Sequence, residues 1–356
     1  MAKFDEEKIR KELFDRTEGY AAGVRSIYLD VMRRLISLAL EIEPDYDPER
    51  AFTFSDYPMI SDRANALLRE LYSRLYQQVQ YGIKNEWEQA NIKADELVMS
   101  IFGANAISDK RFAMYFNRNK KAMDAFFSQT RQDGGLNLSQ RIWKYEGQFR
   151  QDMELAIDCY LGQGMSANRM ATLVKGFLQE PDRLYRRVRN ERGELVLSKN
   201  AKSYHPGPGQ YRSSYRNAQR FTRSETNRAY RTADFERWAQ LNFVVGIEIR
   251  VSDNHPERDI CDDLAGRYPK GFKFVGWHPN CRCHAVAILA SDDEISTLTD
   301  MILMGEDISK FQSKVEVKRP PKAFVMWIHK NRERINDAVS LPYFVRDNSK
   351  YLQLHS

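Results

Sequence analysis

Residues 27–42 read IYLDVMRRLISLALEI, and this stretch decides the fold class. Its apolar side chains recur at intervals of four, four, three and four residues, at Ile27, Val31, Leu35, Leu38 and Ile42. This spacing places them on one face of an α-helix, because a helix completes a turn every ~3.6 residues. Two prolines, Pro44 and Pro48, follow the pattern and would end it. We therefore predict a long amphipathic helix here.

Comparable patterns occur through most of the first half of the chain. One begins at Ser61 or Asp62, residue types that cap helices, and carries an apolar side chain at every fourth position from Leu67 to Val79. The remaining N-terminal helices are predicted at 84–102, 108–130, 139–161 and 166–178. A further helix is predicted over 212–241, and another over 324–338. The chain is therefore expected to be mainly helical.

Two short stretches have the pattern of strands instead. Apolar residues alternate from Val245 to Val251, and Ala285–Leu289 is a short, wholly apolar run. These features predict an α+β fold, mainly α, in which a large helical N-terminal part precedes a small α+β domain with a Cys/His-rich loop. We place a helical domain at 1–205, the α+β domain at 206–290, and a C-terminal extension at 291–356.

The composition excludes several protein classes. The chain has 356 residues, of which 42% are hydrophobic and 29% charged, which excludes global disorder. The longest dense apolar stretch, LISLAL at residues 35–40, is far shorter than the roughly 18 residues that span a bilayer. Charged residues near the N-terminus take the place of the apolar segment of a secretory signal. We therefore expect a cytoplasmic product with no membrane partner.

Basic residues are concentrated in one part of the chain. Residues 183–231 hold 13 lysines and arginines against three acidic residues, a net charge of about +10. Five of these arginines recur at helical spacing and form one stripe: Arg212, Arg216, Arg220, Arg223 and Arg231. Such a stripe could contact double-stranded DNA or an acidic protein surface, and its alternative is a solvated helix face. Within it, Glu225 is expected to form a buried ion pair with Arg223 or Arg228.

Cysteine and histidine residues gather in the loop between the two predicted strands. The loop contains His255 and Cys261 with five residues between them, then His278, Cys281, Cys283 and His284. Structural zinc sites use four sulfur or nitrogen ligands in two close-spaced groups, and this loop has that general form. Leu264 stands where a second cysteine of a Cys-x2-Cys pair would be, so the site would need histidine ligands or only three cysteines. The alternative is a set of ordinary buried thiols.

Enzymatic activity has little support in the residues. The chain lacks a phosphate-binding Gly-x4-Gly-Lys-Ser/Thr loop, a Gly-x-Gly-x2-Gly turn and a His-Glu-x2-His helix. A Cys/His nucleophile pair is possible in principle, with Asp259 or Asp263 orienting a histidine. We therefore expect a protein that is not an enzyme. The alternative is a metal-dependent nuclease, hydrolase or effector enzyme that uses the Cys/His loop.

Three blocks of sequence, in this order, resemble the phage head morphogenesis family, also called the Mu protein F-like or minor capsid protein family. The first is RSETNRA at 223–229, and the second is DICDDLAG at 259–266. The third and most specific is HPNCRC at 278–283. The resemblance covers about residues 211–290. Because Leu264 replaces a cysteine that many members have, it shifts the expected fourth zinc ligand, beside Cys261, Cys281 and Cys283, to His278 or His255.

The resemblance implies a function in the assembly of a virus particle. Members are minor head proteins of phages or prophages, associated with the portal vertex and needed for capsid assembly or genome delivery. It implies no reaction. The expected partners are the portal protein, other capsid or scaffold proteins, and possible contact with DNA without sequence specificity. The expected location is the host bacterial cytoplasm during assembly and then the phage head in the virion.

Overall fold

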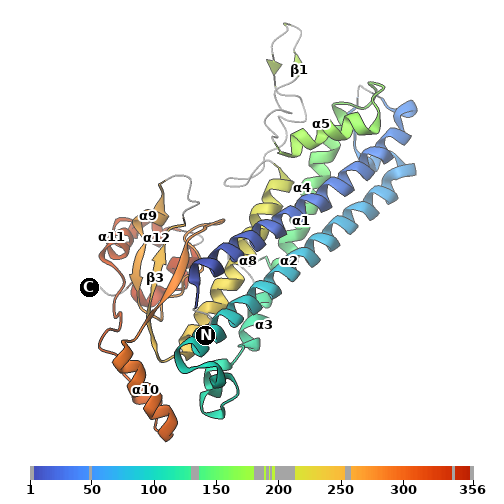
Figure 1. Ribbon diagram of the computed structural model, residues 1–356. Coiled ribbons are helices and arrows are strands. Elements are labelled where there is room, and N and C mark those ends of the chain that lie inside the picture. The colour runs from blue at the N-terminus through green and yellow to red at the C-terminus, as the bar shows by residue number, and fades with distance from the viewer. Residues whose placement is uncertain are drawn as a thin grey trace. The chain divides into compact units, whose positions relative to one another are not determined.

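The computed structural model of the chain describes residues 4–47, 50–129, 136–179, 188–189, 192, 195–196, 213–252, 258–338 and 341–352. Its elements form two compact units. The first contains residues 1–17, 82–135 and 224–356, and the second contains residues 18–81 and 136–223. The boundary between the units lies inside three long helices (Figure 1): α1 (Glu6–Glu41), α2 (Pro58–Phe102) and α8 (Ser214–Gln240).

The second unit is built almost entirely from helices. It contains most of α1, the first half of α2, the N-terminal part of α8, α4 (Leu138–Asp158) and α5 (Ala167–Gln179). Asn137 caps α4 and forms a reciprocal pair of hydrogen bonds with Gln140, as a capping box does. The apolar stripe predicted from Ile27 to Ile42 is buried along α1. A short hairpin of β1 (Val188–Arg189) and β2 (Leu195–Val196) also belongs to this unit.

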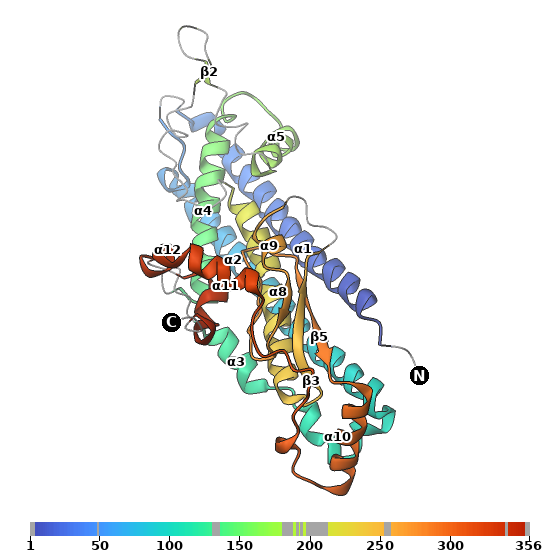
Figure 2. The same cartoon turned by 90° about the vertical axis from the view of Figure 1, so that its left-hand side faces the viewer.

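The first unit contains a three-stranded antiparallel sheet. Its central strand is β3 (Val244–Arg250), which pairs with β4 (Gly266–Tyr268) on one side and β5 (His284–Leu289) on the other. Ile247 lies opposite Tyr268 of β4 and Ala287 of β5. Figure 2 shows the sheet beside the C-terminal part of α8. Trp238, Leu241 and Ile247 share one buried core.

The other α-helices of the first unit are short. They are α3 (Lys120–Ser128), the single turn α9 (Ile260–Asp263), α10 (Asp292–Met304), α11 (Lys322–Lys330), α12 (Arg332–Asn336) and α13 (Tyr343–Arg346). The core around the sheet also includes Leu298, Ile302, Phe324, Phe344 and Val345. The predicted C-terminal extension therefore packs into the same unit as the sheet, because its apolar side chains complete that core.

The predicted fold class, α+β and mainly α, is confirmed. The expected boundary at 205/206 lies outside the described residues, and the compact units are made of discontinuous segments that do not follow the three predicted ranges. This difference arises because long helices contribute residues to both units. None of the helices among the described residues is long and apolar enough to cross a membrane.

Candidate metal centre

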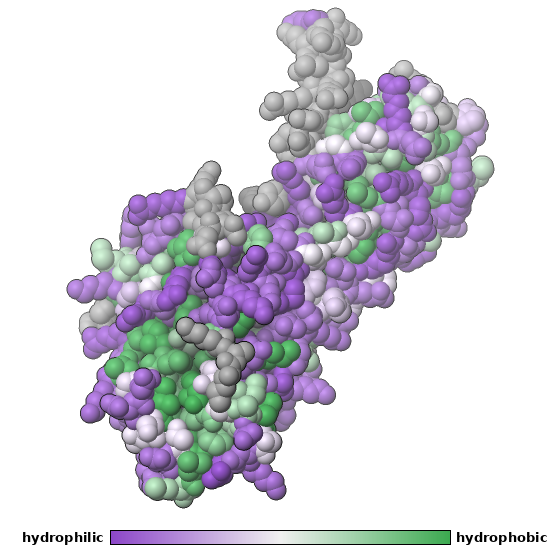
Figure 3. All heavy atoms as spheres, in the orientation of Figure 1, coloured by the Kyte–Doolittle hydropathy of each residue, from purple (hydrophilic) through white to green (hydrophobic). Residues whose placement is uncertain are grey.

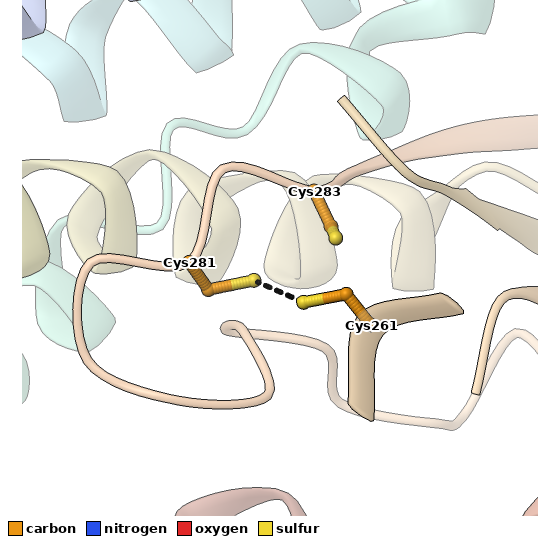
Figure 4. Close-up of side chains that lie close together, drawn as sticks. All are labelled: Cys261, Cys281 and Cys283. Atoms are coloured by element: carbon orange, nitrogen blue, oxygen red, sulfur yellow. Dashed lines mark hydrogen bonds between the residues drawn. The ribbon is translucent and has the colours of Figure 1, made fainter. Parts of the chain in front are cut away.

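Three buried cysteine thiols meet in the first unit. Cys261 comes from α9, and Cys281 and Cys283 come from the segment that leads into β5. Figure 4 shows the three side chains pointing toward one another. The sulfur atoms of Cys261 and Cys281 lie 3.8 Å apart. All three cysteines are free thiols. The structure thus brings Cys261 together with Cys281 and Cys283, which lie 20 or more positions later in the sequence.

The spacing of these thiols suits a metal ion. The ligand atoms of Cys261, Cys281 and Cys283 all lie within 4.8 Å of one another. A tetrahedral zinc ion with Zn–S bonds of ~2.3 Å holds its sulfur ligands ~3.8 Å apart. The Cys261–Cys281 distance of 3.8 Å equals that separation. The cluster could therefore hold a metal without a large movement of these two sulfur atoms.

Hydrogen bonds among the thiols favour one thiolate in the cluster. Hydrogen bonds from Cys261 and then Cys283 hold the pKa of the Cys281 thiol well below its usual range, and the positive charge of Arg231 acts in the same direction. The hydrogen bond with Cys281 in turn raises the pKa of Cys261. Thiolates are the metal-binding form of cysteine, so the lowered pKa of Cys281 favours the form that can bind a metal.

His278 approaches the cluster through Cys261. Its Nε2 atom lies 3.2 Å from the Cys261 sulfur and 3.2 Å from Oδ2 of Asp259. Its Nδ1 atom lies 2.9 Å from the Pro279 carbonyl oxygen, which can only accept a hydrogen bond, so Nδ1 carries a proton. The Nε2 atom of a neutral His278 can therefore accept a hydrogen bond from the Cys261 thiol, and its lone pair is also what would bind a metal. A backbone carbonyl on the other ring nitrogen is typical of metal-binding histidines.

The described ligand atoms form two groups that share Cys261. One group is the three thiols, and the other contains Asp259, Cys261 and His278. His278 is thus beside the thiol cluster but is not grouped with Cys281 and Cys283. Its alternative, His255, lies outside the described residues. Sequence reasoning considered Asp259 only as a partner of a histidine, although the Asp259–Asp262 capping box of α9 is visible as a sequence pattern.

Local structure holds the loop in position around the thiols. Asp259 accepts a hydrogen bond from the Cys261 backbone at the start of α9. Asn280 adopts a left-handed conformation with φ of 63°, and its backbone N–H donates to the Ser224 hydroxyl on α8. Leu264, at the position of the missing cysteine, is fully buried. It therefore contributes to the core and not to the ligand set.

Arg231 is the main link between α8 and the cysteine loop. Its guanidinium donates to three backbone carbonyls, those of Val275, Cys281 and Cys283, at 3.1, 2.8 and 2.6 Å. Gly276, with φ of +118°, allows this approach, because a Cβ there would lie 2.8 Å from Nη1 of Arg231. The prediction that Arg231 contacts an external partner is wrong for this structure: its side chain is buried and fully used within the unit.

The other arginines of the predicted stripe have different surroundings. Arg212 lies outside the described residues, Arg216 is exposed, and Arg220 is half-buried. Arg223 makes a two-pronged ion pair with Glu18 of α1, with N–O distances of 2.8 and 2.7 Å. The expected buried ion pair of Glu225 is confirmed with Arg228, at 3.5 Å. The stripe is therefore not one continuous external surface.

Comparison of the chain with models of protein families, with curated proteins and with solved structures found no match.

Proposed function

We propose that the protein is a minor head protein of a tailed phage or prophage and acts at the portal vertex during capsid assembly. The observation that supports this proposal is the meeting of the three sequence blocks on which the resemblance rests. Ser224 of the first block accepts a hydrogen bond from Asn280 of the third. Cys261 and Asp259 of the second block contact Cys281 and His278 of the third. The shared blocks thus form one structural unit of the fold.

The cysteine cluster would serve this function as a structural zinc site. We propose Cys261, Cys281 and Cys283 as ligands and His278 as the fourth. Three cysteines and one histidine are a ligand set typical of closed structural zinc sites. The ion would join α9 to the segment before β5, because its ligands Cys261 and Cys281 are 20 positions apart in the sequence. Zinc bound in this way adds directly to the free energy of folding.

The expected partner is the portal protein, together with other capsid or scaffold proteins. In this proposal the chain is made in the host bacterial cytoplasm, joins the assembling head, and remains in the virion. The basic residues of α8 would contact packaged DNA or an acidic capsid protein. Attachment to the portal does not require any reaction at the cysteine cluster.

The test is binding to portal rings encoded by the same phage or prophage genome. The purified full-length chain and assembled portal rings would be mixed and separated by analytical ultracentrifugation. The proposal predicts that the chain sediments with the rings at a fixed ratio. A chain that remains unbound to portal rings, and whose deletion leaves the yield of infectious particles unchanged, would contradict it.

Replacement of His278 distinguishes the proposed structural zinc site from the alternative, a metal-dependent nuclease or effector enzyme. A catalytic metal keeps a position open for water or substrate, whereas a structural metal is surrounded by protein ligands. Replacing His278 with Gln would remove turnover from an enzyme while leaving the three thiols in place. If the zinc is structural, the same substitution lowers the melting temperature and no turnover is present in the unsubstituted protein.

A further inference from the structure

Helices α1 and α8 run antiparallel in the second unit, and three contacts define their register. Arg223 pairs with Glu18, the Gln219 side chain donates to the Ala21 carbonyl at 3.1 Å, and the Tyr28 hydroxyl lies 3.4 Å from the Ser214 carbonyl. Each step back along α8 therefore corresponds to a step forward along α1. This register puts Arg25 of α1 opposite Tyr215 and Arg216 of α8.

Arg25 and Arg216 are both exposed, and neither guanidinium has a hydrogen bond or ion pair with another described residue. Arg223, which lies further along α8, differs because it is neutralised by Glu18. Two exposed arginines at neighbouring positions of adjacent helices repel each other weakly in water, and an anion bound between them would remove this repulsion. The positive charges of Arg25 and Arg216 are therefore both exposed to an external ligand.

The electrostatic surroundings of Tyr215 agree with this helix register. Burial raises the pKa of its phenol, and the positive charges of Arg25, Arg223 and Arg216 act against that rise. All three guanidinium groups therefore lie near one phenol, although they come from two helices. The phenol itself is buried, and so the cationic groups form the outer layer of this surface.

The surface around the pair lacks the apolar anchors of a protein interface. Among the described residues, no large hydrophobic side chain is exposed on α1 or α8. Hydrophilic residues predominate over α1 in Figure 3. Stable protein interfaces have an apolar centre, whereas surfaces that bind nucleic-acid backbones are polar and positively charged. The chemistry therefore favours phosphate groups over a protein partner.

We propose that Arg25 and Arg216 form a binding site for the phosphate backbone of double-stranded DNA. Guanidinium groups match phosphate oxygens with paired hydrogen bonds, and two of them on adjacent helices can contact two phosphates or clamp one. Contacts of this kind position DNA without reading its sequence. This proposal rests on the proposed function, in which the basic residues of α8 contact either DNA or an acidic capsid protein. It chooses DNA and names the two arginines that bind it.

The test is the salt dependence of duplex binding by the full-length chain. Fluorescence anisotropy with two 20-base-pair duplexes of unrelated sequence would be measured from about 50 to 200 mM salt. We expect equal affinities for both duplexes. In the double variant Arg25→Gln/Arg216→Gln, the slope of log K against log salt should be shallower by about 1.8, because each lost phosphate contact removes about 0.9. Affinity at the lowest salt should fall at least about tenfold.

A matched control removes one exposed arginine elsewhere in the same unit. Arg169 on α5 is exposed, and Arg169→Gln should leave the slope unchanged. Circular dichroism and melting temperature would verify that each variant is folded, which is expected because both side chains are exposed and neither guanidinium has a hydrogen bond or ion pair with another described residue. An equal slope for the double variant and the unsubstituted chain would overturn the proposal.

A competition experiment distinguishes DNA from an acidic protein. If poly-glutamate displaces the duplex at an equal concentration of negative charge, the site is a general acidic-surface site and the proposal fails. If the double variant loses duplex binding but still sediments with portal rings, the DNA site is supported and is separate from attachment. Loss of portal binding alone would contradict the proposed function and leave the DNA site standing.

Discussion

At the scale of single residues, the arginines of α8 differ in function despite their regular spacing. Arg231 is an internal side chain that holds the cysteine loop, Arg223 is paired with Glu18, and Arg216 is exposed without a partner among the described residues. Helical spacing places them on one helix, but the burial of each depends on which segment packs beside it. Those segments are far away in sequence, so spacing alone could not separate the three roles.

Replacement of Arg231 should destabilise the protein strongly. We expect Arg231→Met to lower the free energy of unfolding by about 3 kcal/mol, because three buried carbonyls lose a charged donor. Urea denaturation followed by circular dichroism would measure the change. The control Arg216→Met removes an exposed arginine from the same helix and should stay within about 0.5 kcal/mol of the unsubstituted protein. Equal effects of the two substitutions would contradict the internal role of Arg231.

Replacement of Glu18 should strengthen duplex binding. Glu18→Gln removes the ion pair between this carboxylate and the Arg223 guanidinium, and with it a negative charge beside the Arg25–Arg216 pair. We expect the slope of log K against log salt to become steeper by up to about 0.9, one additional phosphate contact. Glu41→Gln is the control, because Glu41 neutralises Arg63 in a similar pair at the other end of α1. A Glu18 variant that binds duplex less tightly would count against the site.

At the scale of elements, local patterns predicted where most helices and strands occur, but they were less accurate about the residues at which each one begins and ends. The predicted strands correspond to β3 and β5, and the predicted start of a helix at Asn137 or Ser139 corresponds to α4 with Asn137 as its cap. The helix predicted over 108–130 is wrong. A 3-10 helix at Lys110–Phe116 replaces its first half, and Asn119, in a left-handed conformation with φ of 49°, precedes α3.

Other limits depended on contacts that local patterns do not contain. The two helices predicted at 61–79 and 84–102 are one helix, α2, which continues through the position of Gly82. The helix predicted at 324–338 divides into α11 and α12 at Asn331. Helix α10 was not predicted, although Ser291 and Glu294 form a capping box at its start. Tertiary packing decides these limits, because helices gain most of their stability from the face that they bury.

The start of α10 should make stability depend on pH in the acidic range. Hydrogen bonds from the Lys314 backbone, the Ser313 hydroxyl and the Ser291 backbone lower the pKa of Glu294 to about 2. A carboxyl whose pKa is lower in the folded state stabilises the fold above its unfolded pKa, near 4.5, and this contribution is lost as pH falls toward 2. We expect the melting temperature of the unsubstituted protein to exceed that of Glu294→Gln at pH 6.

The difference between the two melting temperatures should shrink as the pH is lowered from 5 toward ~2, because Gln does not titrate. Asp300→Asn is the control: Asp300 lies on the same helix, and its carboxylate makes no hydrogen bond with another described residue. Differential scanning calorimetry across this pH range gives the comparison. A difference between Glu294→Gln and the unsubstituted protein that stays constant with pH would contradict the assigned hydrogen bonds.

At the scale of the whole molecule, contacts between distant residues were easier to predict from the sequence than the division of the chain into compact units. The blocks at 223–229, 259–266 and 278–283 were grouped by resemblance, and the structure brings them together around three thiols. The domain ranges were drawn along the sequence, whereas the compact units combine distant segments. A division of that kind depends on the long helices that both units share, and no local pattern reveals it.

The central claim is that the cysteine cluster holds a structural zinc ion. Its most direct test is the zinc content of the purified chain, measured by elemental analysis together with the melting temperature before and after a strong chelator. Cys281→Ser removes one thiol of the cluster, and Cys159→Ser is the matched control, because Cys159 belongs to neither candidate metal-binding group found among the described residues. We expect roughly one zinc ion per chain in the unsubstituted protein and in Cys159→Ser, a large loss of thermal stability on chelation, and little zinc in Cys281→Ser. A chain purified without chelators that contains no zinc, and whose melting temperature a chelator leaves unchanged, would contradict the claim.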